Sequence, residues 1–282
     1  MLSKVLKYEN KAMSRIMLPL YAALLASTLV TGILLLISKV RLYNEDNFSY
    51  YLTQPDAVSR ILEIMTTVFM ISFFVLIAAV CVATFIVILL RFNKSCLGDE
   101  GYLTFTLPVS IDDQLWGRIL ASAIWSLLSL IVVFLSIILL IASAGLLPDF
   151  FEGFIDGLKE LFATEGVVGF LVQFVCSMLV SLITAPIACF FCLTLGQLIM
   201  PKHRIAGAFI VYFGLSFIEQ ILVSFLGYFG LKGDYLIDFM LENDFMTIMR
   251  GTLWYELISL LITGTIFYLV TRHILKNRLN LE

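Results

Sequence analysis

The sequence predicts an all-α, polytopic membrane protein with six transmembrane helices, and three observations support this fold class. First, the 282 residues are 61% hydrophobic and only 14% charged, whereas charged residues make up about a quarter of a soluble globular domain. Second, the mean hydropathy is +1.01. Third, six long runs contain almost no charge, and about 20 apolar residues suffice to cross a hydrocarbon core of roughly 30 Å. We therefore expect a single transmembrane domain over residues 1–282.

The six predicted spans lie at about residues 16–38, 64–90, 117–145, 167–199, 205–230 and 251–272. We expect the first span to be retained, because its apolar run is longer than the core of a cleaved signal peptide. Pro186 lies inside the fourth span. A proline within a helix leaves a backbone carbonyl without its donor, so we expect a kink at this position.

Lysine and arginine residues in alternate loops predict the orientation of the spans. With both termini inside, the inner side holds twelve of them: Lys4, Lys7, Lys11, Arg15, Arg91, Lys94, Arg118, Lys202, Arg204, Arg272, Lys276 and Arg278. The outer side then holds six: Lys39, Arg41, Arg60, Lys159, Lys232 and Arg250. This bias predicts that both termini are cytoplasmic. We interpret Lys202-His203-Arg204 as part of this topology signal rather than as a site.

An amphipathic helix is expected at the N-terminus, at about residues 2–15. Lys4, Lys7, Lys11 and Arg15 fall on one face at the helical period of 3.6 residues, opposite apolar residues. Such a helix would lie along the inner leaflet, where each basic residue near anionic lipid contributes about 1 kcal/mol. Ordinary positively charged flanking of the first span explains the same pattern equally well.

A second amphipathic stretch follows the third span. Its acidic stripe consists of Asp149, Glu152, Asp156 and Glu160, and its apolar stripe of Phe150, Phe151, Phe154, Leu158 and Phe162. The period predicts a short helix on the outer surface. This helix would either shape an exit route or cap the helix bundle, and capping is the favoured interpretation.

Little in the sequence indicates catalysis by this chain. The two histidines, His203 and His273, belong to no H-E-x-x-H motif, and no G-x-S-x-G motif is present. Cys189 and Cys192 have a C-x-x-C spacing, but they lie in an apolar run without a nearby histidine. No Gly-Lys dipeptide occurs, so the chain cannot contain a P-loop. We expect no enzymatic activity, cofactor, metal or nucleic acid here.

The most specific segment lies between spans two and three, at about residues 91–116. Gly98 and Gly101 bracket Asp99 and Glu100, which predicts a flexible acidic turn. The apolar side chains that follow would be costly to leave in water: Tyr102, Leu103, Phe105 and Leu107. Either a partner protein covers them, or they dip into the lipid interface as a re-entrant anchor.

This segment has a defined end. Pro108 disfavours helix at the residue before it. Ser110, followed by Asp113 at the third position, has the spacing of a capping box that opens the third span.

The block Gly98-Asp-Glu-Gly-Tyr-Leu-Thr-Phe-Thr-Leu-Pro-Val-Ser110, followed by Gln114-Leu-Trp-Gly117, resembles the loop of a family of bacterial ABC-2-type ABC transporter permeases. Elsewhere the resemblance is one of layout: six spans, an amphipathic N-terminal helix and a polar segment between spans two and three. In the wider family, that segment includes the coupling helix, which sits in a groove of the nucleotide-binding subunit.

The resemblance implies a partner ATPase that binds ATP and Mg²⁺, together with a second permease subunit that is the same or a similar chain. It implies the bacterial cytoplasmic membrane as the location, and an exporter or a resistance or immunity transporter as the function. The residues that it assigns to ATPase docking are Lys94, Leu97, Gly98, Asp99, Glu100, Gly101, Tyr102 and Leu103. Closure of the ATPase would then pull on spans two and three.

Two acidic residues interrupt the last two spans. Glu219 and Glu256 both lie in the outer half of the membrane in the predicted topology. Ionisable groups at such depth usually face a cavity or a partner, although Glu256 stands beside Trp254 and Tyr255, which are typical of the membrane interface. Two alternatives therefore stay open: an ion-coupled secondary transporter that uses these carboxyl groups, and a non-transporting membrane anchor or sensory component.

Overall fold

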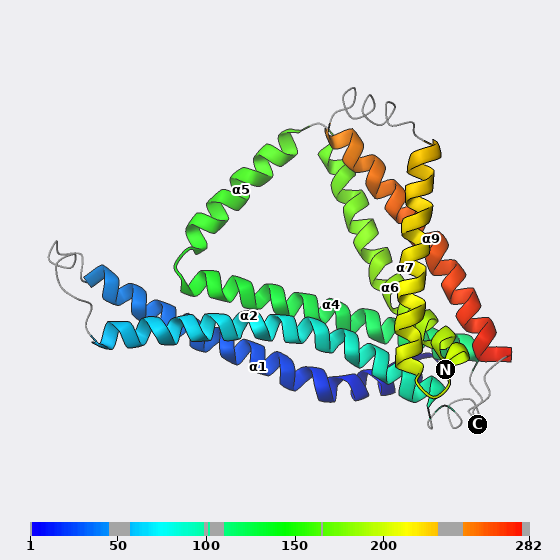
Figure 1. Cartoon of the computed structure of the whole chain (residues 1–282). Helices are drawn as coiled ribbons and strands as arrows, with labels where there is room; N and C mark the ends of the chain where they lie inside the picture. Colours follow the sequence, from blue (N-terminus) through cyan, green and yellow to red (C-terminus); the bar gives the residue numbers. More distant parts are fainter. Residues whose placement is uncertain are drawn as a thin grey trace. The chain divides into compact units, whose positions relative to one another are not determined.

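The computed structural model describes residues 2–44, 57–98, 101, 110–164, 166–230 and 245–277. Every regular element in these ranges is a helix, and Figure 1 follows them along the chain. The elements are α1 (Leu2–Asn44), α2 (Ala57–Phe92), the π-helix η2 (Asn93–Leu97), α4 (Ile111–Ser143), α5 (Leu147–Ala163), α6 (Val167–Ile199), α7 (Arg204–Gly230) and α9 (Phe245–Asn277). The predicted all-α class is confirmed for the described part of the chain.

Six of these helices are long and apolar enough to cross a membrane. The membrane-length segments are Leu2–Ile37, Arg60–Leu97, Ile111–Ser143, Val167–Ile199, Arg204–Ile221 and Met246–Asn277. Each overlaps one predicted span, and the fourth agrees with its predicted bounds. The chain is therefore a multi-pass membrane protein.

Helix α1 runs without a break from Leu2 into the first span. Its 43 residues correspond to a length of about 65 Å, well beyond the hydrocarbon thickness. Lys4, Lys7, Lys11 and Arg15 are all exposed, as expected for the polar face of an amphipathic helix. Residues spaced by three or four positions are buried along the opposite face: Glu9, Met13, Met17, Tyr21, Leu24 and Thr28. The placement of the N-terminal part on the inner leaflet stays a prediction.

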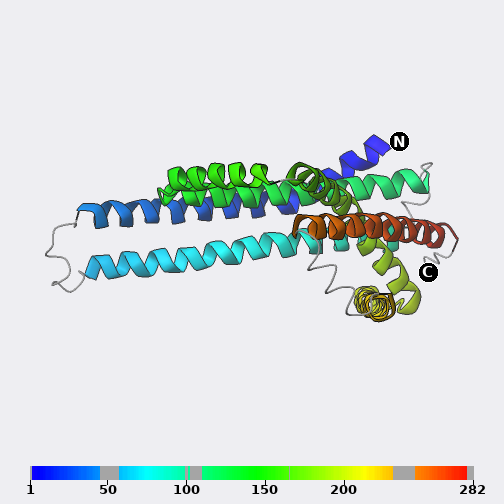
Figure 2. The ribbon, with the colours of Figure 1, turned by 90° about the horizontal axis from the view of Figure 1, so that it is seen from above.

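The described residues group into two compact units. One unit comprises Asn10–Val87 and Ile124–Glu160. In it, parts of α1, α2 and α4 lie side by side, as Figures 1 and 2 both show. A hydroxyl cluster joins the three helices: Ser129 Oγ lies 2.6 Å from Tyr21 Oη and 2.7 Å from Thr84 Oγ1. Hydrogen bonds between helices in an apolar environment make such a bundle specific.

The other unit comprises Met1–Glu9, Ile88–Ala123 and Leu161–Glu282. Within it, α6 packs against both α7 and α9. Helices α6 and α7 approach so closely that a Cβ added to Gly196 would lie 2.7 Å from the carbonyl carbon of Gly207. The rings of Phe191 and Phe267 stack between α6 and α9 at 4.2 Å. The single transmembrane domain expected over residues 1–282 stays a prediction.

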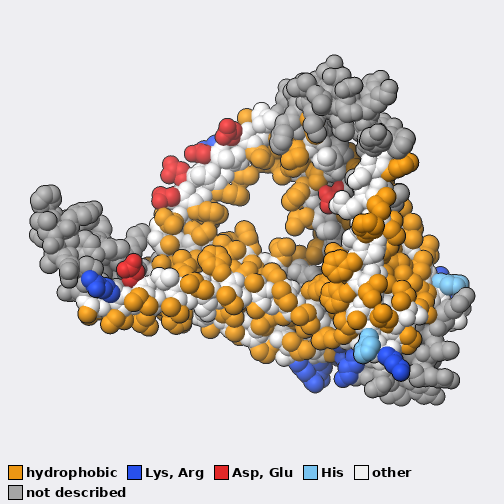
Figure 3. Space-filling model, in the orientation of Figure 1, with side chains coloured by type: hydrophobic (Ala, Val, Ile, Leu, Met, Phe, Trp, Pro, Cys, Tyr) orange, Lys and Arg blue, Asp and Glu red, His pale blue; other side chains and the backbone are white. Residues whose placement is uncertain are grey.

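Large apolar side chains cover the outside of the helices, as Figure 3 shows in orange. Phe74, Phe213 and Phe217 are examples of exposed aromatic residues on the membrane-length helices. Exposing so much apolar protein surface to water would be unfavourable, whereas lipid accommodates it.

Pro186 is buried inside α6, and the helix is continuous on both sides of it. The kink at Pro186 stays a prediction.

Candidate functional site

A buried ionic cluster joins the N-terminal segment to the two helical segments that flank the predicted docking region in the sequence. Glu9 of α1 accepts a hydrogen bond from Arg91 Nε at 2.8 Å and lies 3.3 Å from Arg118 Nε. Arg118 Nε also donates to Ser95 Oγ at 3.0 Å. We call Glu9, Arg91, Ser95 and Arg118 the Glu9 cluster. It connects the N-terminal segment, the end of α2 with η2, and the start of α4.

Burial makes the Glu9 cluster strong. The side chains of Glu9 and Arg118 are each 6% exposed, and that of Arg91 is 28% exposed. Removing one partner of a buried ion pair costs about 3–5 kcal/mol, because the other charge stays desolvated. Exposed pairs contribute only about 0–1 kcal/mol. The three segments are therefore held together by contacts that are difficult to separate.

The π-helix η2 positions Ser95 toward Arg118. It extends α2 by one five-residue turn, Asn93–Leu97, in which Ser95, Cys96 and Leu97 are buried. The ring of Phe92, just before it, stacks on Phe190 of α6 at 4.0 Å. At its end, the Arg204 guanidinium donates a hydrogen bond to the Leu97 carbonyl. Single π-turns frequently occur at functional sites.

The N-terminal segment also packs closely on the start of α4. A Cβ added to Gly117 would lie 2.8 Å from Val5 Cγ1. Gly117 thus permits α1 to approach α4 in the same compact unit that contains Glu9. This contact gives a structural reason for the glycine at the end of the Gln114–Gly117 block.

The start of α4 is fixed by a cap and by a second ionic group. The backbone N–H of Asp113 donates to Ser110 Oγ at 3.1 Å, which confirms the serine N-cap of the predicted capping box. Asp112 accepts hydrogen bonds from Tyr268 Oη at 2.9 Å and from Arg272 Nη2 at 2.7 Å. Both Asp112 and Arg272 are more than 40% exposed, so this pair contributes less than the Glu9 cluster.

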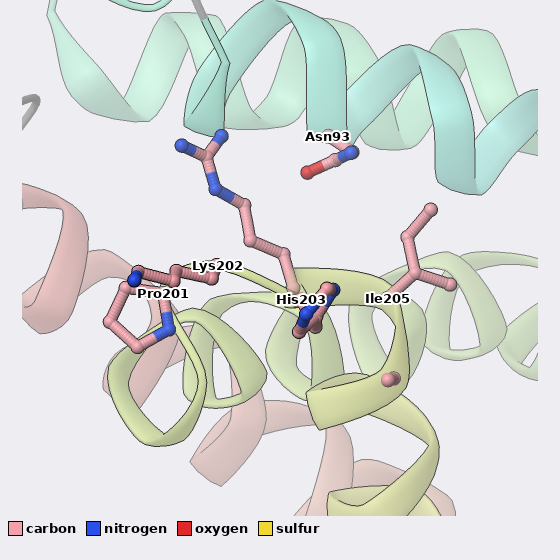
Figure 4. A pocket seen from close by; sticks show the side chains of 7 residues that line it. Asn93, Pro201, Lys202, His203 and Ile205 are labelled. Carbon is pink, nitrogen blue, oxygen red and sulfur yellow. The ribbon is translucent and has the colours of Figure 1, made fainter.

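An open hollow of about 430 Å³ lies beside η2. Asn93 reaches it from one side, and the turn between α6 and α7 lines the other, as Figure 4 shows. These lining residues are Pro201, Lys202 and His203 of the turn, and Arg204, Ile205 and Ala206 at the start of α7. Figure 3 shows basic side chains gathered around this end of α7. The segment 201–206 thus forms a basic wall next to Leu97, one of the described docking residues.

The structure describes four of the eight predicted docking residues. Lys94 is exposed and Leu97 is buried. The Gly101 N–H donates a hydrogen bond to the Gly98 carbonyl at 2.8 Å. Asp99, Glu100, Tyr102 and Leu103 lie outside the described residues. The predicted 91–116 segment is helical at both ends, over 91–97 and 111–116.

Glu219 and Glu256 are both exposed on the surface of the described chain. They belong to α7 and α9 and are not brought together with the Glu9 cluster by any described contact. In the described ranges, no group of three His, Cys, Asp or Glu side chains could hold a metal ion. The described cysteines are all free.

No protein-family model, curated protein or solved structure matches this chain. The function must therefore be inferred from the residues themselves. In the sequence alone, Arg91, Arg118 and Arg204 are explained as topology charges, and Glu9 does not stand out. One signal is nevertheless present: Glu9 is an acidic residue at a position in register with Met13 and Met17 on the buried stripe of α1.

Proposed function

We propose that this chain is the membrane-spanning permease subunit of an ATP-driven transporter of the ABC-2 type, coupled to a separate ATPase through residues 91–116. The observation that carries the proposal is the Glu9 cluster, which ties both ends of this segment and the N-terminal helix into one ionic group. The resemblance of the Gly98–Gly117 block to that permease family gives the class of partner.

The proposed mechanism follows from rigid attachment. Residues 98–110 lie between two helical ends, η2 and α4, that are joined by Arg118 and Ser95. Force applied at Gly98 or Ser110 is passed to membrane-length helices, since η2 follows α2 directly and α4 begins at Ile111. ATP and Mg²⁺ bind to the partner, and its closure moves α2 and α4 together with the N-terminal segment.

The remaining elements of the proposal concern assembly and location. Both termini face the cytoplasm of a bacterium, and the chain lies in the cytoplasmic membrane. A second permease subunit, the same or similar, completes the transporter, and the route lies between the two. Export, resistance or immunity is the proposed role.

Co-purification with an identified ATPase tests this function. The tagged chain is purified from its native membrane after cross-linking, and a P-loop ATPase found with it is then co-expressed and assayed for ATP hydrolysis in lipid. Replacement of Asp99, Glu100 and Tyr102 by alanine should abolish the dependence of ATP hydrolysis on the permease, while leaving the chain inserted. If the triple variant binds the ATPase and supports hydrolysis like the wild type, the proposal is wrong.

A control changes two acidic residues and one aromatic residue elsewhere. Replacing Asp149, Glu152 and Phe151 on α5 by alanine also removes two carboxyl groups and one aromatic ring. This variant should retain ATPase association and coupled hydrolysis. Equal losses in the two triple variants would indicate general damage rather than a docking contact.

The secondary-transport alternative makes a different demand. The purified chain alone would move solute in response to a proton gradient, and Glu219→Gln would abolish that movement. We expect no proton-driven transport by the isolated chain. Gradient-driven transport that needs Glu219 would replace the ATP-driven account.

A further inference from the structure

Helix α5 is the most amphipathic element of the described chain and has no buried residue. At 100° per residue, its large apolar side chains fall within an arc of about 140°: Leu147, Phe150, Phe151, Phe154, Ile155, Leu158, Leu161 and Phe162. Its charged side chains occupy the opposite side: Asp149, Glu152, Asp156, Lys159 and Glu160. None of the side chains on this aromatic face is buried.

The aromatic rings of this face are arranged side by side. Phe150 and Phe154 are stacked with their centroids 6.1 Å apart, and Phe150 and Phe151 meet edge to face at 5.9 Å. Phe154 is 52% exposed and Phe162 is 56% exposed. Such exposure along a whole helical face requires an occupant.

Chain connectivity restricts where this helix can lie relative to the membrane. Membrane-length helices, α4 and α6, precede and follow α5, and only residues 144–146 and 164–166 separate it from them. Each connection contains a glycine with positive φ, Gly145 at 70° and Gly166 at 85°, which permits a sharp turn. Because α5 is not among the membrane-length helices, both of its ends lie at the same membrane surface.

We propose that α5 lies in the membrane interface, with its aromatic face inserted at the boundary between headgroups and acyl chains. The length and the pattern of the helix fit this position. Its 17 residues extend about 26 Å, which is shorter than the hydrocarbon core of about 30 Å. The helix is therefore suited to lying along the membrane surface rather than crossing the membrane. Interfacial helices carry charged side chains on one face and apolar side chains, often aromatic, on the other.

The charge of the polar face determines which lipids favour insertion. Four carboxylates and Lys159 give this face a formal charge of −3, and Lys159 pairs with Asp156 at 2.7 Å. Attraction to anionic headgroups therefore cannot hold α5 at the surface. Insertion must depend on the apolar face, and added anionic lipid should weaken it rather than strengthen it. This inference requires only that α4 and α6 span the membrane, so it is independent of the proposed function.

Spin-label accessibility in the full-length chain tests the proposal. In a background whose five cysteines are replaced by alanine, single cysteines are introduced as Phe154→Cys and Leu158→Cys, with Glu152→Cys and Asp156→Cys as matched controls. The labelled protein is reconstituted in phosphatidylcholine vesicles, with or without phosphatidylglycerol. Labels at residues 154 and 158 should collide more with oxygen and less with a water-soluble nickel complex than labels at 152 and 156.

Two results would overturn the inference. Equal access of the nickel complex to residues 152 and 154 would place the whole helix in water. Low access of both reagents to residue 154 would mean that protein covers the face, and dipolar broadening between labels would then identify a second copy. If the cysteine-free protein is not monodisperse, the test uses Phe154→Trp and Glu152→Trp, each in the native chain, in place of the spin labels. Brominated lipid should then quench the added fluorescence of Phe154→Trp but not that of Glu152→Trp.

Discussion

Replacement of Glu9 by glutamine should destabilise the protein far more than its position near the N-terminus suggests. Gln keeps nearly the same shape but removes the charge that faces two guanidinium groups, Arg91 at 2.8 Å and Arg118 at 3.3 Å. Arg118 is 6% exposed, so water cannot replace the lost carboxylate. Its remaining partners are neutral oxygens of Ser95 and Gln114.

The expected magnitude follows from this burial. Breaking a buried pair by removing one partner costs about 3–5 kcal/mol. On the scale of domains of 150–250 residues, where 1 kcal/mol shifts Tm by about 2–4 °C, the apparent Tm should fall by on the order of 10 °C. The matched control is Asp112→Asn, which breaks a pair of similar geometry at 2.6 Å whose side chains are 46% and 42% exposed. That change should cost about 0–1 kcal/mol.

Thermal unfolding in detergent, followed by the loss of the monodisperse chromatographic peak, measures both changes. Hydrogen exchange adds a local readout, since amides of residues 2–9 and 93–97 should lose protection in Glu9→Gln and keep it in Asp112→Asn. A double-mutant cycle between Glu9→Gln and Arg118→Gln should give a coupling of at least about 1 kcal/mol. Equal Tm values for wild type and Glu9→Gln would refute the reasoning that burial makes this cluster strong.

Three further predictions concern packing and polar contacts. Gly196→Ala places a Cβ against the α7 backbone and should lower the unfolding free energy by about 1–3 kcal/mol. The control, Gly214→Ala, has open space around the added Cβ and should raise the unfolding free energy by up to about 1 kcal/mol in the same thermal assay. Ser129→Ala removes the centre of the hydroxyl cluster and should cost about 1 kcal/mol, while Ser181→Ala, whose hydroxyl bonds only its own helix, should change Tm little. Arg204→Gln removes the guanidinium donor to the Leu97 carbonyl and should speed hydrogen exchange in residues 93–97; unchanged exchange would show that Arg204 does not hold η2.

The helices were predictable because their signals are local. Each span is a long apolar run, interrupted away from its ends only by Glu219 in the fifth and Glu256 in the sixth. The ends of the fourth span at Val167 and Ile199 agree with the sequence prediction. The Ser110 cap was predictable for the same reason, since its partner is three residues away. The periodicity of residues 149–162 likewise predicted α5.

The candidate site was not predictable in the same way. Glu9 meets Arg91 across 82 positions, and nothing local to either residue indicates the other. The π-turn after Phe92 adds one turn to α2. Its contacts, with Phe190 of α6 and with Arg204, come from residues far away in the sequence. Positive charge near the ends of spans has a general role in topology, which accounts for Arg91, Arg118 and Arg204 in the sequence without indicating their structural contacts.

Photo-cross-linking from position 102 tests the central claim most directly. A photoreactive phenylalanine analogue replaces Tyr102 in the otherwise native chain, the cells are irradiated, and the adducts are identified by mass spectrometry. The account predicts a covalent adduct with a P-loop ATPase, formed on the cytoplasmic side and lost when Asp99 and Glu100 are also replaced by alanine. Adducts with lipid alone would contradict it, because residues 102–107 would then be a membrane anchor and not a docking surface.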